Sequence, residues 1–190
     1  MTDPVQIRTA RLLLRPFTAD DLAAHHAAVW GDPQVTTFLP GGQPRSLEET
    51  QLVLNRYLSC WERDNDAAWA VVLPESGRLI GECGMSVKAN RERDVEISYA
   101  LASDQWGQGY ATEVARACLH FGFEGFGLPY LRAVASPENA ASRRVMEKLG
   151  MTFDGLIRYP VRTEETLAYY RIERAAFNPN GHPYTVTKTG

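Results

Sequence analysis

Hydrophobic residues recur along this chain at two spacings, and both predict regular structure in its N-terminal part. Leu12 to Arg15 has the pattern of a strand, and Thr18 after it is placed to cap a helix. Ser46 with Glu49 three residues later fits a capping box, after which apolar residues return every three or four positions. The pattern therefore predicts one strand followed by two amphipathic helices.

The middle of the chain carries the strongest strand patterns. Ala67 to Leu73 is almost entirely apolar, Pro74 to Gly77 has turn chemistry, and Leu79 to Met85 resumes as a hairpin partner. Val95 to Leu101 follows as a further strand. We expect these segments to form a series of antiparallel strands.

Helices and strands alternate in the C-terminal half. A short strand at Leu131 to Ala135 lies between two predicted helices, and Phe153 to Arg158 and Thr166 to Arg174 close the pattern as strands. The length of 190 residues fits one mixed α/β domain. The last stretch, Asn178 to Gly190, has two prolines, two glycines and no apolar periodicity, so we expect an irregular tail there.

Composition and charge narrow the classes of partner. Hydrophobic residues make up 44% of the chain and charged residues 23%, which is typical of a globular protein. The net charge of -3 gives no basic excess, so neither nucleic acid nor an anionic membrane is an expected partner. The N-terminal segment lacks the apolar stretch of a signal peptide, and we predict a cytoplasmic protein.

The cysteines indicate neither a disulfide framework nor a metal site. Cys60, Cys83 and Cys118 are odd in number and widely spaced, with no nearby pair of histidines. We expect them to be reduced, with Cys118 on the buried face of a helix, and we expect no metal.

The most informative segment runs from Val95 to Phe123, where a strand, a turn and a helix follow one another. Gly107 and Gly109 mark the turn, which opens onto a helix N-terminus whose free N–H groups can hold a diphosphate. A bare tight turn is the alternative. A dinucleotide site is a further alternative, but Thr112 stands where its third small residue would be, and the preceding strands are predicted to be an antiparallel hairpin series.

A second motif follows the strand at Leu131 to Ala135. Asn139 is placed to cap a helix that runs to Leu149, and Gly150 is a suitable stop. Ala141 and Val145, with Leu149, are expected to form its buried stripe. By itself the segment predicts only a capped amphipathic helix.

Together the two segments resemble the GNAT acetyltransferase superfamily, particularly its branch of ribosomal-protein N-terminal (alanine/serine) acetyltransferases. The matching motifs are W-G-Q-G-Y-A-T-E at Trp106 to Glu113 and N-x-x-S-x-x-x-x-E-K-x-G at Asn139 to Gly150. The likeness extends more loosely from Arg8 to Phe177, which implies a GNAT-like domain over residues 8–177 and a tail over 178–190. The implied fold is a mixed, mostly antiparallel sheet with splayed central strands, flanked by helices.

The resemblance also implies acetyl-CoA as the acetyl donor. Its pyrophosphate would lie on the turn amides and its pantetheine between the strands that end at Leu101 and Ala135. Trp106 stands where many members begin the turn with Arg or Gln, and Met146 where many have Tyr. The residues expected to bind the cofactor are Tyr99, Ala100, Leu101, Trp106, Gly107, Gln108, Gly109, Tyr110, Ala111, Thr112, Asn139 and Ser142.

Acetyl transfer to an amine needs a base, an oxyanion donor and a hydrogen bond or proton for the leaving thiolate. We predict Glu96 as the base, directly or through a water, with a surface carboxylate beside Arg93 or Arg132 as the structural alternative. Glu82 is a second candidate carboxylate if the strand register permits. Ser142 would serve the sulfur, and a backbone N–H near residues 99–101 the oxyanion.

The predicted function is acetyl-CoA-dependent N-acetylation, by direct transfer to a primary amine of a protein N-terminus or a small molecule in a ternary complex. The alternative is a non-catalytic acyl-CoA-binding sensor or interaction module on the same fold. Residues 30–46 and 158–166 would wall the acceptor cleft, with Trp30, Phe38 and Tyr159 as aromatic candidates. Monomer and homodimer both remain open.

Overall fold

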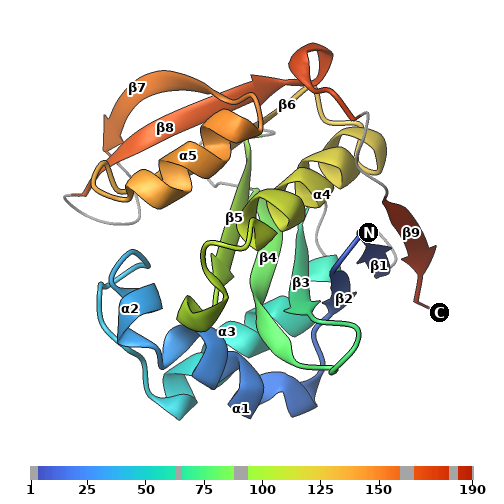
Figure 1. The fold of residues 1–190 in the computed structure, drawn as a ribbon, viewed down its shortest axis with the longest axis vertical. Helices are drawn as coiled ribbons and strands as arrows, with labels where there is room; N and C mark the ends of the chain where they lie inside the picture. The colour runs from blue at the N-terminus through green and yellow to red at the C-terminus, as the bar shows by residue number, and fades with distance from the viewer. Residues whose placement is uncertain (1–3, 63–65, 88–93, 159–164, 180–183, 190) are drawn as a thin grey trace.

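A nine-stranded sheet organises the part of the chain that this computed structural model describes, residues 4–62, 66–87, 94–158, 165–179 and 184–189 (Figure 1). Its strand order is β7-β8-β6-β5-β4-β3-β2-β1-β9. The strands are β1 (Val5–Arg8), β2 (Leu13–Pro16), β3 (Ala67–Val72), β4 (Leu79–Val87), β5 (Val95–Leu101), β6 (Tyr130–Ala135), β7 (Thr152–Arg158), β8 (Thr166–Glu173) and β9 (Thr185–Lys188).

Helices cover both faces of this sheet. The α-helices are α1 (Leu22–His25), α2 (Pro33–Thr36), α3 (Leu47–Leu58), α4 (Tyr110–Glu124) and α5 (Ala140–Lys148). Shorter turns are η1 (Ala19–Asp21), the π-helical η2 (His26–Trp30), η3 (Cys60–Glu62), η4 (Ser103–Gln105) and η5 (Arg174–Ala176). Among the described residues, no helix is long and apolar enough to cross a membrane.

Neighbouring residues of β4 show which helices lie on which face. The Sγ of Cys83 is 3.8 Å from the carbonyl oxygen of Val114 in α4. The preceding residue, Glu82, hydrogen-bonds His25 of α1 and Tyr57 of α3. Successive side chains of a strand point to opposite faces. Thus α4 covers one face and α1 with α3 the other, as Figure 1 shows with α4 in front of the sheet and α3 behind it.

The core is thickest where β3 and β4 pass between the helices. Every residue of β3 is buried, which explains the continuous apolar run in its sequence. Trp69 of β3 is fully buried and packs edge-on against Trp61 and Phe121, with ring centroids 5.3 and 5.4 Å apart. Each such side chain contributes about 1.5–3 kcal/mol by leaving water.

The sheet splits between β5 and β6, as the family resemblance implies. Strands β4 and β5 are paired at seven positions, whereas β5 and β6, which run parallel, pair only at Glu96 and Arg132. Beyond that pair the strands diverge toward their ends at Leu101 and Ala135. The split therefore has a closed end at Glu96 and Arg132 and an open end near the start of α4 and α5.

The predicted helix caps are present. Ser46 and Glu49 form a capping box at α3, Thr18 and Asp21 form one at η1, and Asn139 accepts a hydrogen bond from the Ser142 amide at α5. The first helix differs from the expectation because it passes from a 3-10 turn through one α-turn into the π-turn η2.

Two expectations about the C-terminal part need correction. Residues 178–190 were expected to be irregular, but Thr185–Lys188 forms β9 and pairs with β1 at four positions. These four residues are all exposed, so the strand has no buried face and its sequence shows no apolar pattern. Its β-branched Thr and Val residues are the remaining indication of a strand. Of the stripe expected at α5, Leu149 at the helix end is buried and Val145 packs partly buried against the core, but Ala141 is exposed. Within the helix the buried residue is Met146.

Candidate active site

The glycine turn lies at the open end of the split. Gly107 and Gly109 have φ of 78° and 80°, a conformation that side chains with Cβ rarely adopt, and α4 begins at Tyr110 directly after them. The amide of Glu113 is bonded to the Gly109 carbonyl at 3.1 Å and starts the helical ladder. The amides before it in the first turn have no intrahelical acceptor, so they form the anion-binding end of the helix.

Trp106 holds the turn against the end of β5. Its indole N–H donates to the carbonyl oxygen of Leu101 at 2.8 Å, while 47% of the residue stays exposed. Many resembling proteins have Arg or Gln at the position of Trp106, and here the indole hydrogen bond to Leu101 takes the place of any contact from those side chains. It fixes the path of the chain but brings no positive charge to the turn.

A pair of hydroxyl groups bridges the open end of the split. The phenol oxygen of Tyr99 on β5 lies 3.1 Å from Ser142 Oγ and 3.2 Å from the Ser142 carbonyl oxygen on α5. Burial raises the pKa of the Tyr99 phenol above its ordinary value, more than the Ser142 hydrogen bond lowers it. The phenol is therefore protonated at neutral pH and can hold Ser142 in a fixed orientation.

Sequence reasoning missed this use of Tyr99, which was expected to contribute only its backbone. Met146, where many resembling proteins have Tyr, is 1% exposed and fills the core behind α5. A phenol is nevertheless present in the site, from a different element. The alternation along β5 could have indicated it, because Tyr99 shares a face with Ile97 and Leu101.

Glu96 lies at the closed end of the split, in a buried ion-pair network. Its carboxylate is 3.4 Å from the guanidinium of Arg132, which also contacts Asp94 at 2.7 Å. The Tyr130 hydroxyl donates to Asp94 at 3.2 Å. Of the two arginines weighed as partners for Glu96, the structure shows Arg132, while Arg93 lies outside the described residues. Glu96 and Tyr99 are three residues apart, so they point to opposite faces of β5.

Glu82, the second candidate carboxylate, is enclosed by donors on the α1 and α3 face. It accepts hydrogen bonds from His25, from the Trp30 indole at 3.1 Å and from the Tyr57 hydroxyl at 3.0 Å. Burial and the Glu82 charge raise the pKa of Tyr57 well above its ordinary value. Both carboxylate oxygens of Glu82 accept hydrogen bonds, and these bonds connect β4 to α1, η2 and α3.

A cleft of about 440 Å³ lies at the open end, between residues 37–42, 136–138 and 165–167. Phe38, predicted as an aromatic wall, lines this cleft and is 41% exposed. Trp30 is buried instead, with Arg45 stacked 4.1 Å from its ring centre, and Tyr159 lies outside the described residues. The cleft thus borders the two chain segments expected to wall the acceptor site.

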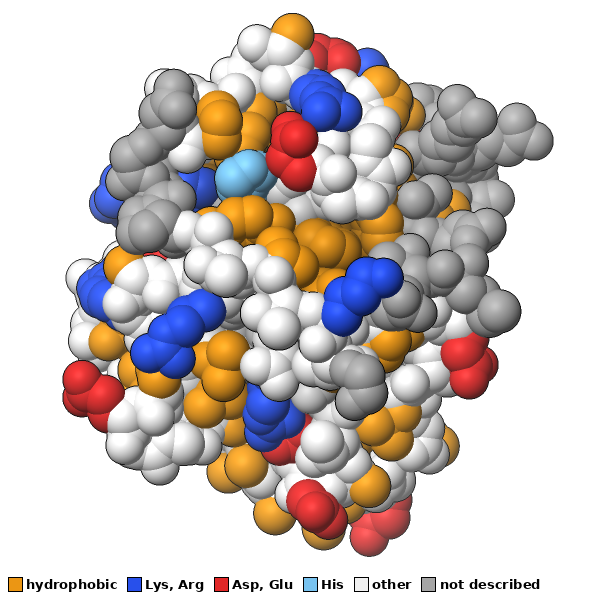
Figure 2. Space-filling model, turned by 90° about the vertical axis from the view of Figure 1, so that its right-hand side faces the viewer, with side chains coloured by type: hydrophobic (Ala, Val, Ile, Leu, Met, Phe, Trp, Pro, Cys, Tyr) orange, Lys and Arg blue, Asp and Glu red, His pale blue; other side chains and the backbone are white. Residues whose placement is uncertain are grey.

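A smaller cleft of about 280 Å³ follows the outer side of α4, lined by residues 9–11 and by Phe177 and Tyr184 of the C-terminal segment. Figure 2 views the side of the molecule that carries β1 and β9, where hydrophobic side chains lie in a hollow. The three cysteines are free and buried, and no cluster suited to a metal occurs among the described residues.

A sheet that splits at one parallel strand pair, with a glycine turn and a helix N-terminus at the split, defines an acetyltransferase type of α/β fold. The crystal structure of an acetyltransferase from Agrobacterium tumefaciens str. C58 matches with a TM-score of 0.76 at 31% identity, covering 89% of this chain and 94% of that one. Mycobacterium smegmatis RimJ, solved in complex with CoA-disulfide, matches in fold with a TM-score of 0.77 at 21% identity, covering 92% and 91%.

Sequence comparison agrees with the structural match. The family model described as Acetyltransferase (GNAT) domain matches residues 11–152. YkkB of Bacillus subtilis (strain 168), an uncharacterised protein, is 32% identical over 184 residues, which is 94% of this chain and all of YkkB. The chain belongs to the GNAT acetyltransferase family, and its structural neighbours include ribosomal-protein alanine and serine acetyltransferases.

Proposed function

We propose that this protein transfers an acetyl group directly from acetyl-CoA to a primary amine, with both substrates bound at once. The acceptor is the α-amine of a protein or the amine of a small molecule. The observation that carries the proposal is the split sheet with the turn of Gly107 and Gly109 at its open end. Family membership and the CoA-bound neighbour support the same donor.

The donor would lie along the turn and into the split. Its diphosphate binds the amides of residues 107–111, and its pantetheine pairs with backbone groups of residues 99–101 that have no partner on β6. Asn139 uses its carbonyl oxygen to cap α5, so it would bind pantetheine through its amide nitrogen. A backbone N–H of residues 99–101 meets the oxyanion.

The acceptor amine must lose a proton before it attacks, since an α-amine has a pKa of about 8 and lysine about 10.4. Glu96 is the proposed base. It lies roughly 10 Å along β5 from Tyr99 and on the other face, so we assign it a water-mediated role. The amine enters through the cleft of residues 37–42 and 136–138.

The leaving sulfur is assigned to Ser142. The N–C bond forms as the amine nitrogen attacks the carbonyl carbon, the nitrogen releases its second proton to solvent water, and the C–S bond breaks with its electron pair leaving on sulfur. Ser142 donates a hydrogen bond to this thiolate while Tyr99 holds the serine in place. A thiolate with a pKa of about 8.5 needs no proton from serine and takes one from water.

The test is acetylation of a panel of peptides with free N-termini and of small amines. Thiol release from acetyl-CoA and a gain of one acetyl mass on the acceptor are the two readouts, with N-acetylated peptides as the matched blanks. We expect Glu96→Gln and Ser142→Ala to reduce turnover while CoA still binds, with Glu124→Gln at the far end of α4 as control. Binding of CoA without turnover on any acceptor would favour the sensor alternative.

A further inference from the structure

Arg11, in the turn between β1 and β2, reaches the start of α4, which is about a hundred positions away in the sequence. Its guanidinium contacts Glu113 Oε2 through Nε at 2.8 Å and Nη2 at 2.6 Å. Its Nη1 donates to the carbonyl oxygen of Gln108 at 2.9 Å, and its charged centre lies 4.5 Å from the Tyr110 ring centre. One side chain thus touches three residues of the cofactor turn and its helix.

Glu113 is held from the same side by two further donors. The Thr9 hydroxyl donates to Oε1 at 2.6 Å, and the backbone N–H of Arg11 at 3.0 Å. Partial burial acts to raise the pKa of Glu113, but these hydrogen bonds from Thr9 and Arg11 hold it below its ordinary value. The carboxylate is therefore ionised at neutral pH and lies in the first turn of α4.

The contact with Gln108 determines where a turn amide points. The Gln108 carbonyl and the Gly109 N–H belong to one trans peptide, so they point in opposite directions. Arg11 binds the carbonyl, which turns the Gly109 N–H away from Arg11. A Cβ built on Gly109 would be 3.6 Å from Arg11 Nη2, so the guanidinium borders the turn on that side. The turn is thereby ordered before any ligand binds.

Charge gives Arg11 a second effect. The Glu113 carboxylate stabilises α4 through the helix dipole, but it would repel a diphosphate bound at the same helix end. Arg11 neutralises it. Because Trp106 occupies the turn position that is Arg or Gln in many resembling proteins, this position supplies no charge, and the Arg11 guanidinium beside the turn comes from the first hairpin.

We infer that Arg11 is a positioning residue for the cofactor turn, which orients the Gly109 amide through Gln108 and neutralises Glu113 beside the CoA diphosphate. The inference rests on the proposed binding of CoA at this turn. It predicts that replacing Arg11 lowers the affinity for ligands that carry the diphosphate and leaves the affinity for ligands without it unchanged.

The experiment compares CoA with pantetheine, which lacks the diphosphate, by calorimetry on the full chain. Arg11→Met is expected to weaken CoA binding about tenfold, the effect of one lost charge-assisted contact, and to leave pantetheine binding unchanged. Adding Glu113→Gln to Arg11→Met should recover part of the affinity, because the repelling carboxylate is gone. The CoA affinity of Arg11→Lys should lie between those of the unchanged protein and Arg11→Met, because a lysine ammonium lacks the planar guanidinium that binds Glu113 and Gln108 together.

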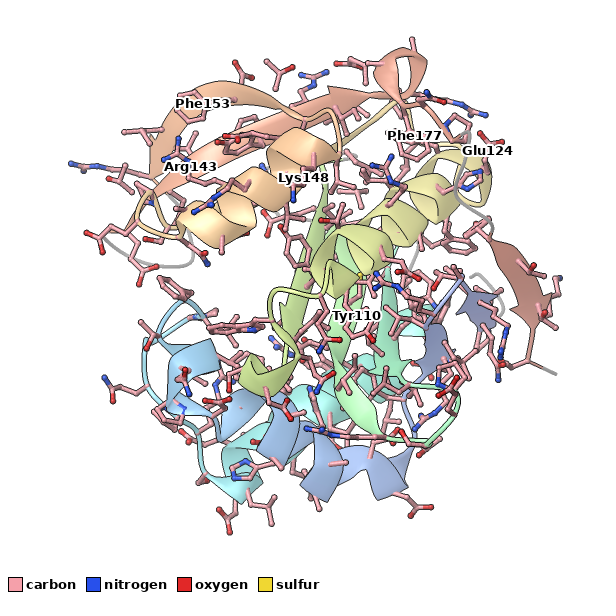
Figure 3. The ribbon with its side chains drawn as sticks, viewed as in Figure 1. Tyr110, Glu124, Arg143, Lys148, Phe153 and Phe177 are labelled. Atoms are coloured by element: carbon pink, nitrogen blue, oxygen red, sulfur yellow. The ribbon has the colours of Figure 1, made fainter. Side chains whose placement is uncertain are left out.

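Arg174→Met is the matched control. Arg174 pairs with Glu124 at 3.2 Å at the other end of α4, where Figure 3 labels Glu124 far from Tyr110, and its loss should change neither ligand. An equal loss of CoA and pantetheine affinity in Arg11→Met, or no rescue by Glu113→Gln, would overturn the inference. If Arg11→Met is unfolded, Arg11→Lys carries the same comparison. Failure of the unchanged protein to bind CoA would refute the proposed donor site as well.

Discussion

The two ends of the split between β5 and β6 are built from different chemistry. At the closed end, Arg132 is paired with Asp94 at 2.7 Å and Glu96 at 3.4 Å, and all three residues are less than 9% exposed. At the open end, β5 is joined to α5 by the neutral contact of Tyr99 and Ser142 at 3.1 Å.

The difference follows from what each end must do. A buried ion pair is costly to separate, because a single charge left without its partner stays desolvated. A neutral hydroxyl group can exchange a hydrogen bond within the protein for one to a ligand or water, and the net difference in free energy is only about 1 kcal/mol. Charges therefore hold the strands together where they pair, and neutral donors lie where a ligand has to enter.

The largest expected effect comes from breaking the closed end. Arg132→Met removes the cation that pairs with the buried Asp94 carboxylate at 2.7 Å, and we expect the free energy of unfolding to fall by about 3–5 kcal/mol. Urea unfolding at pH 7 measures it. Arg78→Met is the control, because its pair with Asp104 is about half exposed and screened by solvent, so its loss should change the free energy of unfolding little. An equal fall in the free energy of unfolding in the two variants would show that the buried ion pairs of the closed end stabilise the fold no more than an exposed pair does.

Changing Ser142 should affect chemistry and leave the fold intact. Ser142→Ala removes the donor assigned to the leaving thiolate, and kcat is expected to fall about 100-fold, as for loss of one preorganised donor at a developing charge. Steady-state kinetics with a reactive acceptor separates kcat from KM. A rise in KM at constant kcat would instead assign Ser142 to binding alone.

Tyr99→Phe should have a smaller effect, because the phenol acts through Ser142. Losing one neutral hydrogen bond of about 1 kcal/mol corresponds to about a fivefold fall in kcat. The double variant Tyr99→Phe with Ser142→Ala should be no slower than Ser142→Ala alone. Additive losses would show that Tyr99 contributes independently of Ser142.

Much of this site was predictable because its signals are local. The bounds of β5, the turn at Gly107 and Gly109 and the cap at Asn139 each depend on a few neighbouring residues. The family motifs imply that the turn and α5 lie at the same split.

The unpredicted part depends on register and on contacts distant in sequence. Glu82 and Cys83 are neighbours, yet only their contacts across the fold, from Glu82 to His25 and Tyr57 and from Cys83 to Val114, show which of them faces α1 and α3. Arg11 meets Glu113 only because the first hairpin lies beside α4. A β9 strand made of exposed residues gives no hydrophobic pattern at all.

A change of pH tests the open end in a further way, through the buried phenol of Tyr99. The folded pKa of Tyr99 is raised by burial, so its proton stabilises the fold fully below the unfolded pKa of about 10 and loses that effect as pH rises further. The unchanged protein should therefore lose stability relative to Tyr99→Phe above pH 10, by at most about 1.4 kcal/mol per pH unit. Urea unfolding of both proteins from pH 8 to 11 measures the difference, and other tyrosines cancel in the subtraction. A constant difference across this range would mean that the phenol at the open end is not buried, and the proposed fixed orientation of Ser142 would fall with it.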